Sequence, residues 1–290
     1  MELFAVLHHE KTALDDIALN LDAQYRWLHY FNDLPLWVFG VTFFAVMLIT
    51  MELGFRVGRK HRRTLRNAES GGGGIVQTSI FAVLGLVLAF TYSAGLARFE
   101  ARKAAVLNEV NALGTAFLRA DLASEPGRTA LMESLYEYAV TRSIPPRTSV
   151  TLKDQKIYFS KTLEKQERLW PAVKLVMAQD NPVPLEISIV SSINNVLDAH
   201  TIRLAAVIET LHPTIVLLLL LVTASAMAVA GFNAGIHGRM SRWRMNAFAI
   251  VLAILVFVIK DLDRPNDGTI IVDQRLINFL IADMHKTLHE

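Results

Sequence analysis

The sequence of 290 residues contains no cysteine. Disulfide bonds, thiolate nucleophiles and cysteine-ligated zinc sites are therefore excluded. Charged residues are also scarce, at 19% of the chain, and the formal net charge is only +2. A balance so close to neutrality gives no indication of nucleic-acid binding. The amino-terminal residues lack a basic stretch followed by an apolar core, so we expect no cleavable signal peptide.

Motifs of common enzymes are missing as well. The sequence has no G-x-S-x-G nucleophile elbow. Four consecutive glycines at 71–74 are not followed by the Lys-Ser/Thr pair of a phosphate-binding loop. A glycine run of this kind is typical of a flexible connector. We therefore expect the protein not to be an enzyme.

Apolar residues are abundant instead. They make up 52% of the chain, and the mean hydropathy is +0.34, which is too apolar for a soluble domain of this size. A helix needs about 20 apolar residues to cross a bilayer core of about 30 Å. The sequence predicts four such spans, at Leu34–Phe55, Ile75–Ala97, Pro213–Gly235 and the shorter Asn246–Ile259.

The second of these runs organises the prediction. Residues 75–97 carry no charge, and Arg98, Glu100, Arg102 and Lys103 follow at once with no glycine or proline between them. The pattern predicts one long helix that leaves the membrane and continues into water. Apolar residues then recur at helical spacing as far as Leu118, which indicates a face that packs against another element.

We predict an all-α membrane protein with four transmembrane helices and a helical extramembrane domain of about 110 residues. The predicted divisions are an amphipathic segment at 1–33, spans one and two with a basic, glycine-rich loop at 34–97, the helical domain at 98–211, spans three and four at 212–262, and a carboxy-terminal amphipathic helix at 263–290. Within the domain we expect further helices at Leu131–Arg142, Lys153–Gln179 with a kink at Trp170-Pro171, and Leu185–Leu211, the last after a loop containing Pro182 and Pro184.

The charges of the two short loops predict the orientation. The loop after the first span carries six Lys and Arg residues, and the loop after the third carries three. The positive-inside rule places both loops in the cytoplasm, and therefore both termini and the helical domain outside.

Several segments carry a family resemblance. LGLVLAF at 84–90, followed by Ser93-Ala94 and by RFEARK at 98–103, resembles the second membrane helix of bacterial bestrophins. The motifs E-x-G-x-R-x-G-R at 52–59, E-x-N-A-x-G-T-A-x-x-R-A-D at 109–121 and DLDRP at 261–265 are similar to those of a bestrophin-like family of unknown function. The resemblance extends over most of residues 45–285.

The resemblance implies a homopentameric ion channel in a bacterial inner membrane, with the second spans around a central pore. The side chains that match the pore neck are Ala82, Leu86 and Phe90, at i, i+4 and i+8, so one helix face can present all three. Ala82 is smaller than the bulky residue expected at its level. The alternative is that this stripe packs against another helix. The resemblance also implies a cytoplasmic domain with both termini inside, against the loop charges, which we keep as the prediction of sidedness.

Charges on the long helix are candidates for structural or gating roles. They are Arg98, Glu100, Arg102, Glu109, Arg119 and Asp121. Glu109 and Arg119 are too far apart to pair within one helix, so we expect pairing across subunits or with Arg142 or Arg203. Charges that instead face a central pathway would attract counter-ions and set selectivity.

The candidate calcium site consists of Asp261, Asp263 and Asp267, with Gly268, because closely spaced carboxylates suit a hard cation such as Ca²⁺. Bestrophins place an acidic calcium clasp near the end of their fourth span. The favoured alternative is a helix end, at which Pro265 ends the span and Asp263 pairs with Arg264 or with an arginine of the domain. No other cofactor is expected.

Two functions from different classes remain open. The first is an oligomeric channel that passes small ions along the axis of the second spans. The second is a membrane-anchored scaffold or sensor, whose helical domain binds a partner without conductance. The expected partners in the first case are the lipid bilayer, further copies of the chain and small ions, without nucleic acid.

Overall fold

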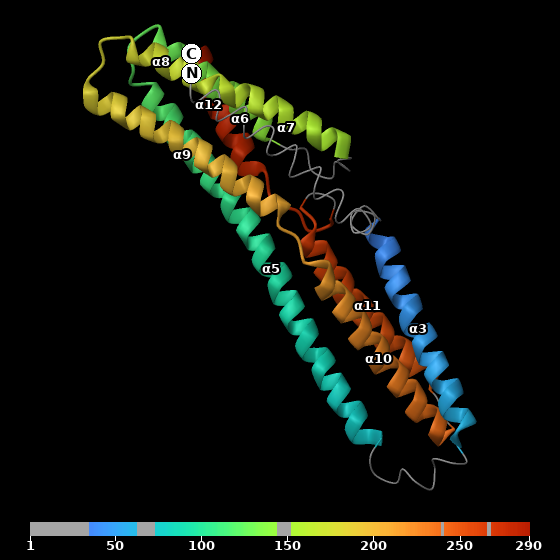
Figure 1. Ribbon diagram of the computed structural model, residues 1–290. Helices are drawn as coiled ribbons and strands as arrows, with labels where there is room; N and C mark the ends of the chain where they lie inside the picture. The colour runs from blue at the N-terminus through green and yellow to red at the C-terminus, as the bar shows by residue number, and fades with distance from the viewer. Residues whose placement is uncertain (1–34, 63–72, 144–151, 239–240, 266–267) are drawn as a thin grey trace. The chain divides into compact units, whose positions relative to one another are not determined.

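The computed structural model describes residues 35–62, 73–143, 152–238, 241–265 and 268–290 (Figure 1). Within these residues every regular element is a helix. The helices are α3 Leu36–Lys60, α5 Gly73–Ala120, α6 Gly127–Arg142, α7 Leu152–Glu167, α8 Leu169–Met177, α9 Val183–Ile208, α10 Pro213–His237, α11 Arg242–Asp263 and α12 Arg275–His289. The amphipathic segment predicted at 1–33 lies outside the described residues.

Four helical stretches in the described part of the chain are long and apolar enough to cross a membrane. They are α3, α5, the stretch 183–237, whose apolar part is α10, and α11. The fourth span is longer than the sequence indicated, since α11 has 22 residues and begins at Arg242. At 1.5 Å per residue it extends about 33 Å, so it is long enough to cross the bilayer core by itself.

Helix ends differ from the prediction where charged residues or prolines lie. Helix α3 continues beyond the predicted end of the span at Phe55, through Arg56 and Arg59, because a charged residue does not by itself end a helix. The helix expected at Lys153–Gln179 is two helices that part at Arg168. Pro171 lacks the N–H that would bond to the carbonyl of Glu167, which accounts for the break. Pro184 is not in a loop but in the first turn of α9, where its missing N–H costs nothing.

The chain forms two compact units. The first comprises the residues up to Leu88 together with His212–Phe257, and the second comprises Ala89–Leu211 together with Val258–Glu290. In the first unit α3, α5, α10 and α11 share one apolar cluster, whose buried members include Phe43, Met47, Leu84, Met227 and Leu252.

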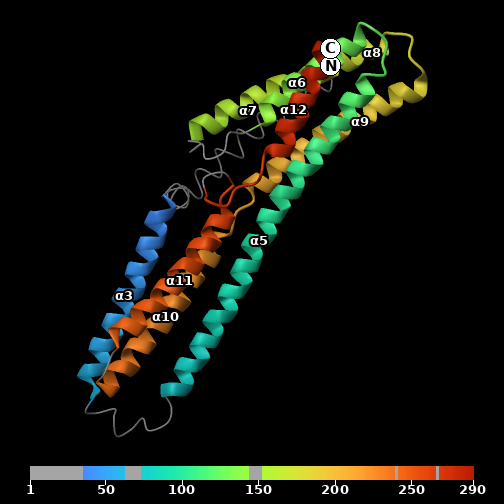
Figure 2. The same ribbon diagram turned by 180° about the vertical axis from the view of Figure 1, so that it is seen from behind.

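Helices α3 and α10 approach each other through glycines and lie side by side in both views (Figures 1 and 2). A Cβ added at Gly54 of α3 would overlap the backbone of Ala228, and one added at Gly231 of α10 would overlap the backbone of Met51. Gly58 and Gly235, one turn further along, are in the same position. Small residues four apart let two membrane helices pack backbone to backbone. This packing explains the two glycines in the motif at 52–59.

The second unit has its own core. Helices α5, α6, α8, α9 and α12 contribute to it, and Leu113, Leu135, Tyr138 and Ile193 are among its largest fully buried side chains. The carboxy-terminal helix α12 packs into this core through Ile277 and Met284. The core therefore joins the carboxy-terminal helix to α5, in the first half of the sequence.

The close packing of α3 on α10 yields a first prediction. Gly231→Ala should lower the free energy of unfolding by about 1–3 kcal/mol, because the added methyl group forces the two backbones apart. Gly85→Ala is the matched control, since a Cβ there meets nothing within 4 Å. Thermal unfolding of the detergent-solubilised protein measures both. Equal melting temperatures for the two variants would contradict the role of the glycines.

Candidate functional site

Helix α5 has one exposed side along its whole length. The exposed positions Ser79, Ala82, Leu86, Phe90, Ser93, Ala97, Glu100, Ala104, Leu107, Asn111, Thr115 and Leu118 recur every three or four residues. At 3.6 residues per turn they all lie on one side of the helix. The buried positions, among them Leu84, Gly95, Arg102, Glu109 and Leu113, lie on the opposite side.

The three side chains expected to line a pore lie on this exposed side. Leu86 and Phe90 are 56% and 68% exposed in the single chain, and Ala82 is exposed too. Leu84, by contrast, is buried in the apolar cluster of the spans. Ala82, Leu86 and Phe90 therefore do not belong to the core that their own spans form.

On the buried side, Glu109 is the centre of a charged cluster. Its carboxylate accepts a hydrogen bond of 2.7 Å from Nε of Arg142 and one of 2.5 Å from Nη1 of Arg203. The Tyr138 hydroxyl donates to the same carboxylate at 3.1 Å. The side chains of Glu109, Arg142 and Arg203 are at most 5% exposed. These contacts connect α5, α6 and α9, and they confirm the expected partners of Glu109.

Burial and charge fix the protonation states in the cluster. Burial alone would raise the pKa of Glu109, but the charges and hydrogen bonds of Arg142 and Arg203 outweigh it and hold the pKa below its usual value. Burial, followed by the charge of Glu109, raises the pKa of Tyr138 well above its usual value. Burial and Arg142 lower the pKa of His200, whose Nδ1 lies 3.2 Å from the Tyr138 hydroxyl, to about 4. At neutral pH, one carboxylate thus faces two guanidinium groups beside a neutral histidine, so the cluster keeps one positive charge in excess.

Arg119 and Asp121, at the end of α5, contact other parts of the second unit. Arg119 donates through Nη1 to the carbonyl of Ser188 in α9, at 3.0 Å. Asp121 pairs with Arg128 at the start of α6, at 2.6 Å. Both contacts position neighbouring helices against α5.

The charges closest to the apolar run make local contacts. Arg98 is half-buried and donates to the carbonyl of Ala94 in its own helix, at 3.1 Å. Glu100 is exposed, with Lys103 at 3.7 Å. In the first unit Glu52 pairs with Arg56, four residues further along the same helix, at 3.1 Å.

Arg102 connects α5 to the end of α11. Its guanidinium donates to the carbonyls of Leu262 and Asp263, two of the last acceptors of that helix. The Asp263 carboxylate accepts from the backbone N–H of Leu211 at 2.7 Å and from Lys260 Nζ at 3.0 Å. The side chain of Asp263 therefore pairs with Lys260 and not with the expected arginine. Arg102 binds the main-chain carbonyl of Asp263 instead.

Asp261 closes the loop that follows α11. It accepts hydrogen bonds from the N–H groups of Thr269 and Ile270, at 2.8 and 3.2 Å, and from the Thr269 hydroxyl. A Cβ at Gly268 would overlap this carboxylate, so the loop needs glycine there. We call the contacts of Arg102, Asp261 and Asp263 the α11 clasp.

The donors around Asp261 and Asp263 bear on the calcium prediction. A calcium ion at these carboxylates would compete with backbone N–H groups, a hydroxyl and the Lys260 ammonium. In the described part of the chain no three His, Asp or Glu side chains are grouped so as to hold a metal ion. Asp267, the third predicted ligand, lies outside the described residues, so calcium binding stays a prediction.

Sequence reasoning missed some of the residues that complete these sites. Tyr138 and His200 gave no signal, since one looks like an ordinary core aromatic and the other like a polar residue on an amphipathic helix. Arg102 was recognised as a charge of interest, but its binding to the end of α11 joins residues 160 apart in the sequence. Only the tertiary structure brings these groups together.

The cluster around Glu109 yields a second prediction. Glu109→Gln should lower the free energy of unfolding by about 3–5 kcal/mol, because it leaves two buried guanidinium groups without their counter-charge. Glu100→Gln removes the same charge at an exposed position of the same helix and should change stability by less than about 0.5 kcal/mol. Thermal unfolding measures both variants, and a small loss at Glu109 would show that the two buried guanidinium groups do not depend on this carboxylate.

Comparison with known proteins shows a matching family model and solved structures with a similar fold. The family model described as Bestrophin-like domain matches residues 41–275. A bacterial bestrophin homologue from Klebsiella pneumoniae superimposes with a TM-score of 0.59 at 10% sequence identity, over 84% of this chain and 98% of that one. A mutant of that homologue gives 0.62 at 10% identity, over 84% and 98% of the two chains.

A further crystal structure, described as a membrane protein variant, superimposes with a TM-score of 0.61 at 10% identity, over 86% of this chain and 99% of that one. No curated protein is similar enough to the chain to match it. At such low identity, the structural likeness shows a shared fold.

Proposed function

The chain belongs to the Bestrophin-like domain family, and from this premise we propose that it forms a homo-oligomeric ion channel with α5 around the pore. The exposed side of α5 is the observation that carries the proposal. Ala82, Leu86 and Phe90 follow one another at successive turns there, outside the core of their own spans. Around a symmetry axis, they would form three stacked rings.

Apolar rings of this kind control ion passage through water. A narrow apolar constriction empties of water and stops ions, and it conducts when it widens or becomes polar. Leu86 and Phe90 would form the narrow rings, and Ala82 a wider one. The first charge on the exposed side beyond them is Glu100, at the place where the chain enters water.

The remaining parts of the proposal concern the domain and the membrane. Residues 98–211 form the extramembrane domain, the assembly is a pentamer, and the membrane is the bacterial inner membrane. The arginine-rich segments at 56–66 and 239–244 favour both termini on the outer side. Because the chain has no cysteine, labelling a single cysteine introduced at the exposed Leu175 tests this orientation from outside the cell. Labelling only after the membrane is opened would reverse it.

Ion flux into liposomes tests the channel. The wild-type protein should conduct, and Leu86→Ser should raise the flux severalfold, because a polar ring keeps water in the constriction. Leu221→Ser on α10 is the matched control, since Leu221 is also 56% exposed but belongs to a different span. Its flux should equal that of the wild type.

Two results would overturn the proposal. No flux under any pH or calcium concentration, together with a dimer in single-particle images, would favour the scaffold or sensor that the sequence left open. Equal effects of Leu86→Ser and Leu221→Ser would place the pore elsewhere than at the exposed side of α5. Five subunits around an axis with α5 innermost is the expected image.

We further propose that the α11 clasp works without a metal. Its carboxylates already accept protein hydrogen bonds, so calcium should change neither the melting temperature nor the flux. Asp267→Asn is the variant to test, because Asp267 is the third predicted ligand. A calcium-dependent rise in melting temperature that this variant abolishes would establish the calcium site instead.

A further inference from the structure

Positive charges gather at one end of the first unit, where α3 and α10 end and α11 begins (Figures 1 and 2). Gly54 of α3 lies against Ala228 of α10. Gly58, one turn later, lies against Phe232, so the two helices run parallel and end together. We call this end of the unit the basic end, and its exposed cationic side chains are Arg56, Arg59, Lys60, Arg62, Arg242 and Arg244.

One carboxylate faces these six cations. Glu52 is the only Asp or Glu among the described residues of the first unit, which therefore carry a net formal charge of +5. It binds Nε of Arg56 at 3.1 Å and lies 3.8 Å from Nη2 of Arg242 in α11. An arginine of α3 and one of α11 thus stand beside each other. Their side chains are 73% and 69% exposed, so both can bind a further anion.

An exposed apolar stripe runs along α3 up to these cations. Ile49, Leu53 and Val57 are each at least 50% exposed and recur every four residues, so they share one side of the helix. Arg56 and Lys60 continue the same side. Along this side of α3, apolar side chains are therefore followed by positive charges where the chain leaves the span.

Helix α11 has the same order of groups, counted from its first turn. Trp243 directly follows Arg242 and is 78% exposed. Ile250 and Ile254 are exposed too, and they lie on the side of Trp243, two and three turns further into the span. Tryptophan at the end of a span is typical of the membrane–water boundary. Trp243 therefore marks the level at which phospholipids carry their headgroups.

This order of groups identifies the class of ligand. A phospholipid carries a phosphate at the end of apolar chains, and it already lies along the spans. Guanidinium groups bind phosphate oxygens in pairs, and basic sites between membrane helices bind anionic headgroups. A soluble anion or an acidic protein segment would match the cations alone. Only an anionic lipid matches the cations and the apolar stripes together.

We propose that the basic end binds an anionic phospholipid, with the phosphate between Arg56 and Arg242 and an acyl chain along the apolar stripe of α3. The site goes beyond the proposed channel and does not depend on it, because a non-conducting scaffold in the same membrane would bind the lipid equally well.

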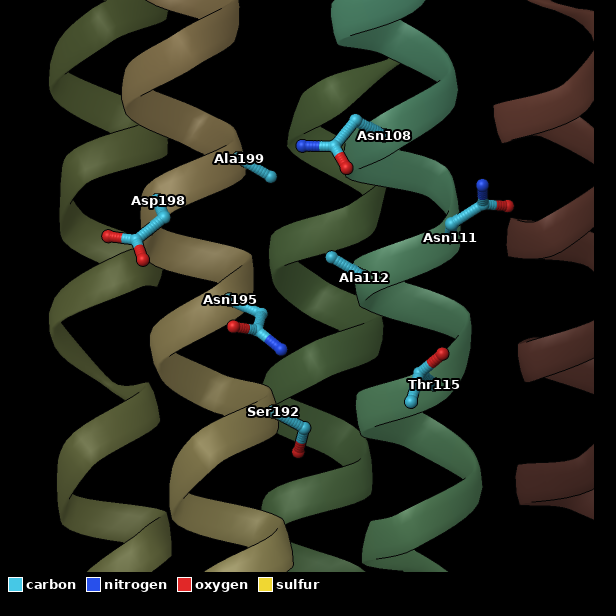
Figure 3. Close-up of a pocket in the computed structure, with 8 residues that line it drawn as sticks. All are labelled: Asn108, Asn111, Ala112, Thr115, Ser192, Asn195, Asp198 and Ala199. Carbon is cyan, nitrogen blue, oxygen red and sulfur yellow. The ribbon is translucent and has the colours of Figure 1, made fainter.

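The polar groove of the second unit differs in charge from this site. It lies between α5 and α9, has a volume of about 270 Å³, and is shown with its lining side chains in Figure 3. Asn108 and Asn195 line it together with the carboxylate of Asp198, and none of its lining residues is a cation. It therefore offers no counter-charge to a phosphate, and Asn195→Leu is a control that should leave lipid binding unchanged.

The melting temperature of the full-length protein in a neutral detergent tests the proposal. Dioleoyl-phosphatidylglycerol should raise it, because a ligand of the folded state stabilises that state, and dioleoyl-phosphatidylcholine at the same concentration should not. Arg56→Gln and Arg242→Gln should each weaken binding about fivefold. Arg168→Gln is the matched control, since Arg168 is also exposed and also pairs with a glutamate four residues earlier, Glu164, but belongs to α7. It should bind the lipid like the wild type.

Glu52→Gln should act in the opposite direction. Its carboxylate occupies both arginines, so its removal leaves them to the phosphate and should tighten binding. Native mass spectrometry gives a second measurement that does not depend on stability. The wild type should retain phosphatidylglycerol, and the double variant of Arg56→Gln with Arg242→Gln should lose it.

Four results would overturn the proposal. Equal stabilisation by phosphatidylcholine would show that the phosphate site does not select an anionic lipid. Equal stabilisation by glycerol 3-phosphate would show a soluble-anion site that makes no use of the apolar stripe. Stabilisation by polyglutamate and not by phosphatidylglycerol would favour an acidic protein segment. Equal losses of binding in Arg56→Gln and Arg168→Gln would show that only the total charge of the protein matters.

Discussion

A buried carboxylate that binds two arginines is the interaction on which the second unit depends. Glu109 would be costly to bury alone, and Arg142 and Arg203 would be costlier still without it, so the three charges have to be placed together. Glu109 belongs to α5, Arg142 to α6 and Arg203 to α9, and their geometry fixes the register of these helices. The apolar core beside them, around Leu113, provides the burial that drives folding. The ion pairs add little to that driving force, but they restrict how the core can assemble.

The contacts of the α11 clasp follow the same physical rule, that a buried polar group needs a partner of opposite charge. The last carbonyls of a helix have no partner in that helix and carry a partial negative charge, which a guanidinium satisfies well. Arg102 does so for α11, and it lies on the same buried side of α5 as Glu109, seven residues or two turns earlier. The motif DLDRP thereby gains a structural meaning. Asp263 holds the backbone before α10, and Asp261 folds the loop after α11.

Much of this fold follows from local sequence patterns, and the remainder does not. The four spans were predictable because apolar length suffices to identify them. Arg142 and Arg203 were foreseeable partners because a buried glutamate needs a cation, and both arginines lie on helices of the same predicted domain. The predicted helix ends were wrong where a charged residue was taken as the end of a helix, as at Arg56. The glycines of α3 were visible as a motif. Their role in packing depends on α10, however, whose Gly231 follows Gly54 by 177 residues. Sequence alone does not place these two helices side by side. Tyr138 and His200 were missed because their contacts join residues 29 and 62 positions apart on different helices.

Helix α5 has a buried side, which carries Arg102 and Glu109, and an exposed side opposite to it. No proline interrupts the helix between Gly73 and Ala120, so its buried and exposed sides keep their direction over the full length. Arg102 and Glu109 fix the rotation of the helix about its own axis, because both must point into their sites. In the second unit, that rotation determines which side chains of α5 stay exposed, Leu107, Thr115 and Leu118 among them. Charged contacts with α6, α9 and the end of α11 thus decide which side of α5 this unit leaves open.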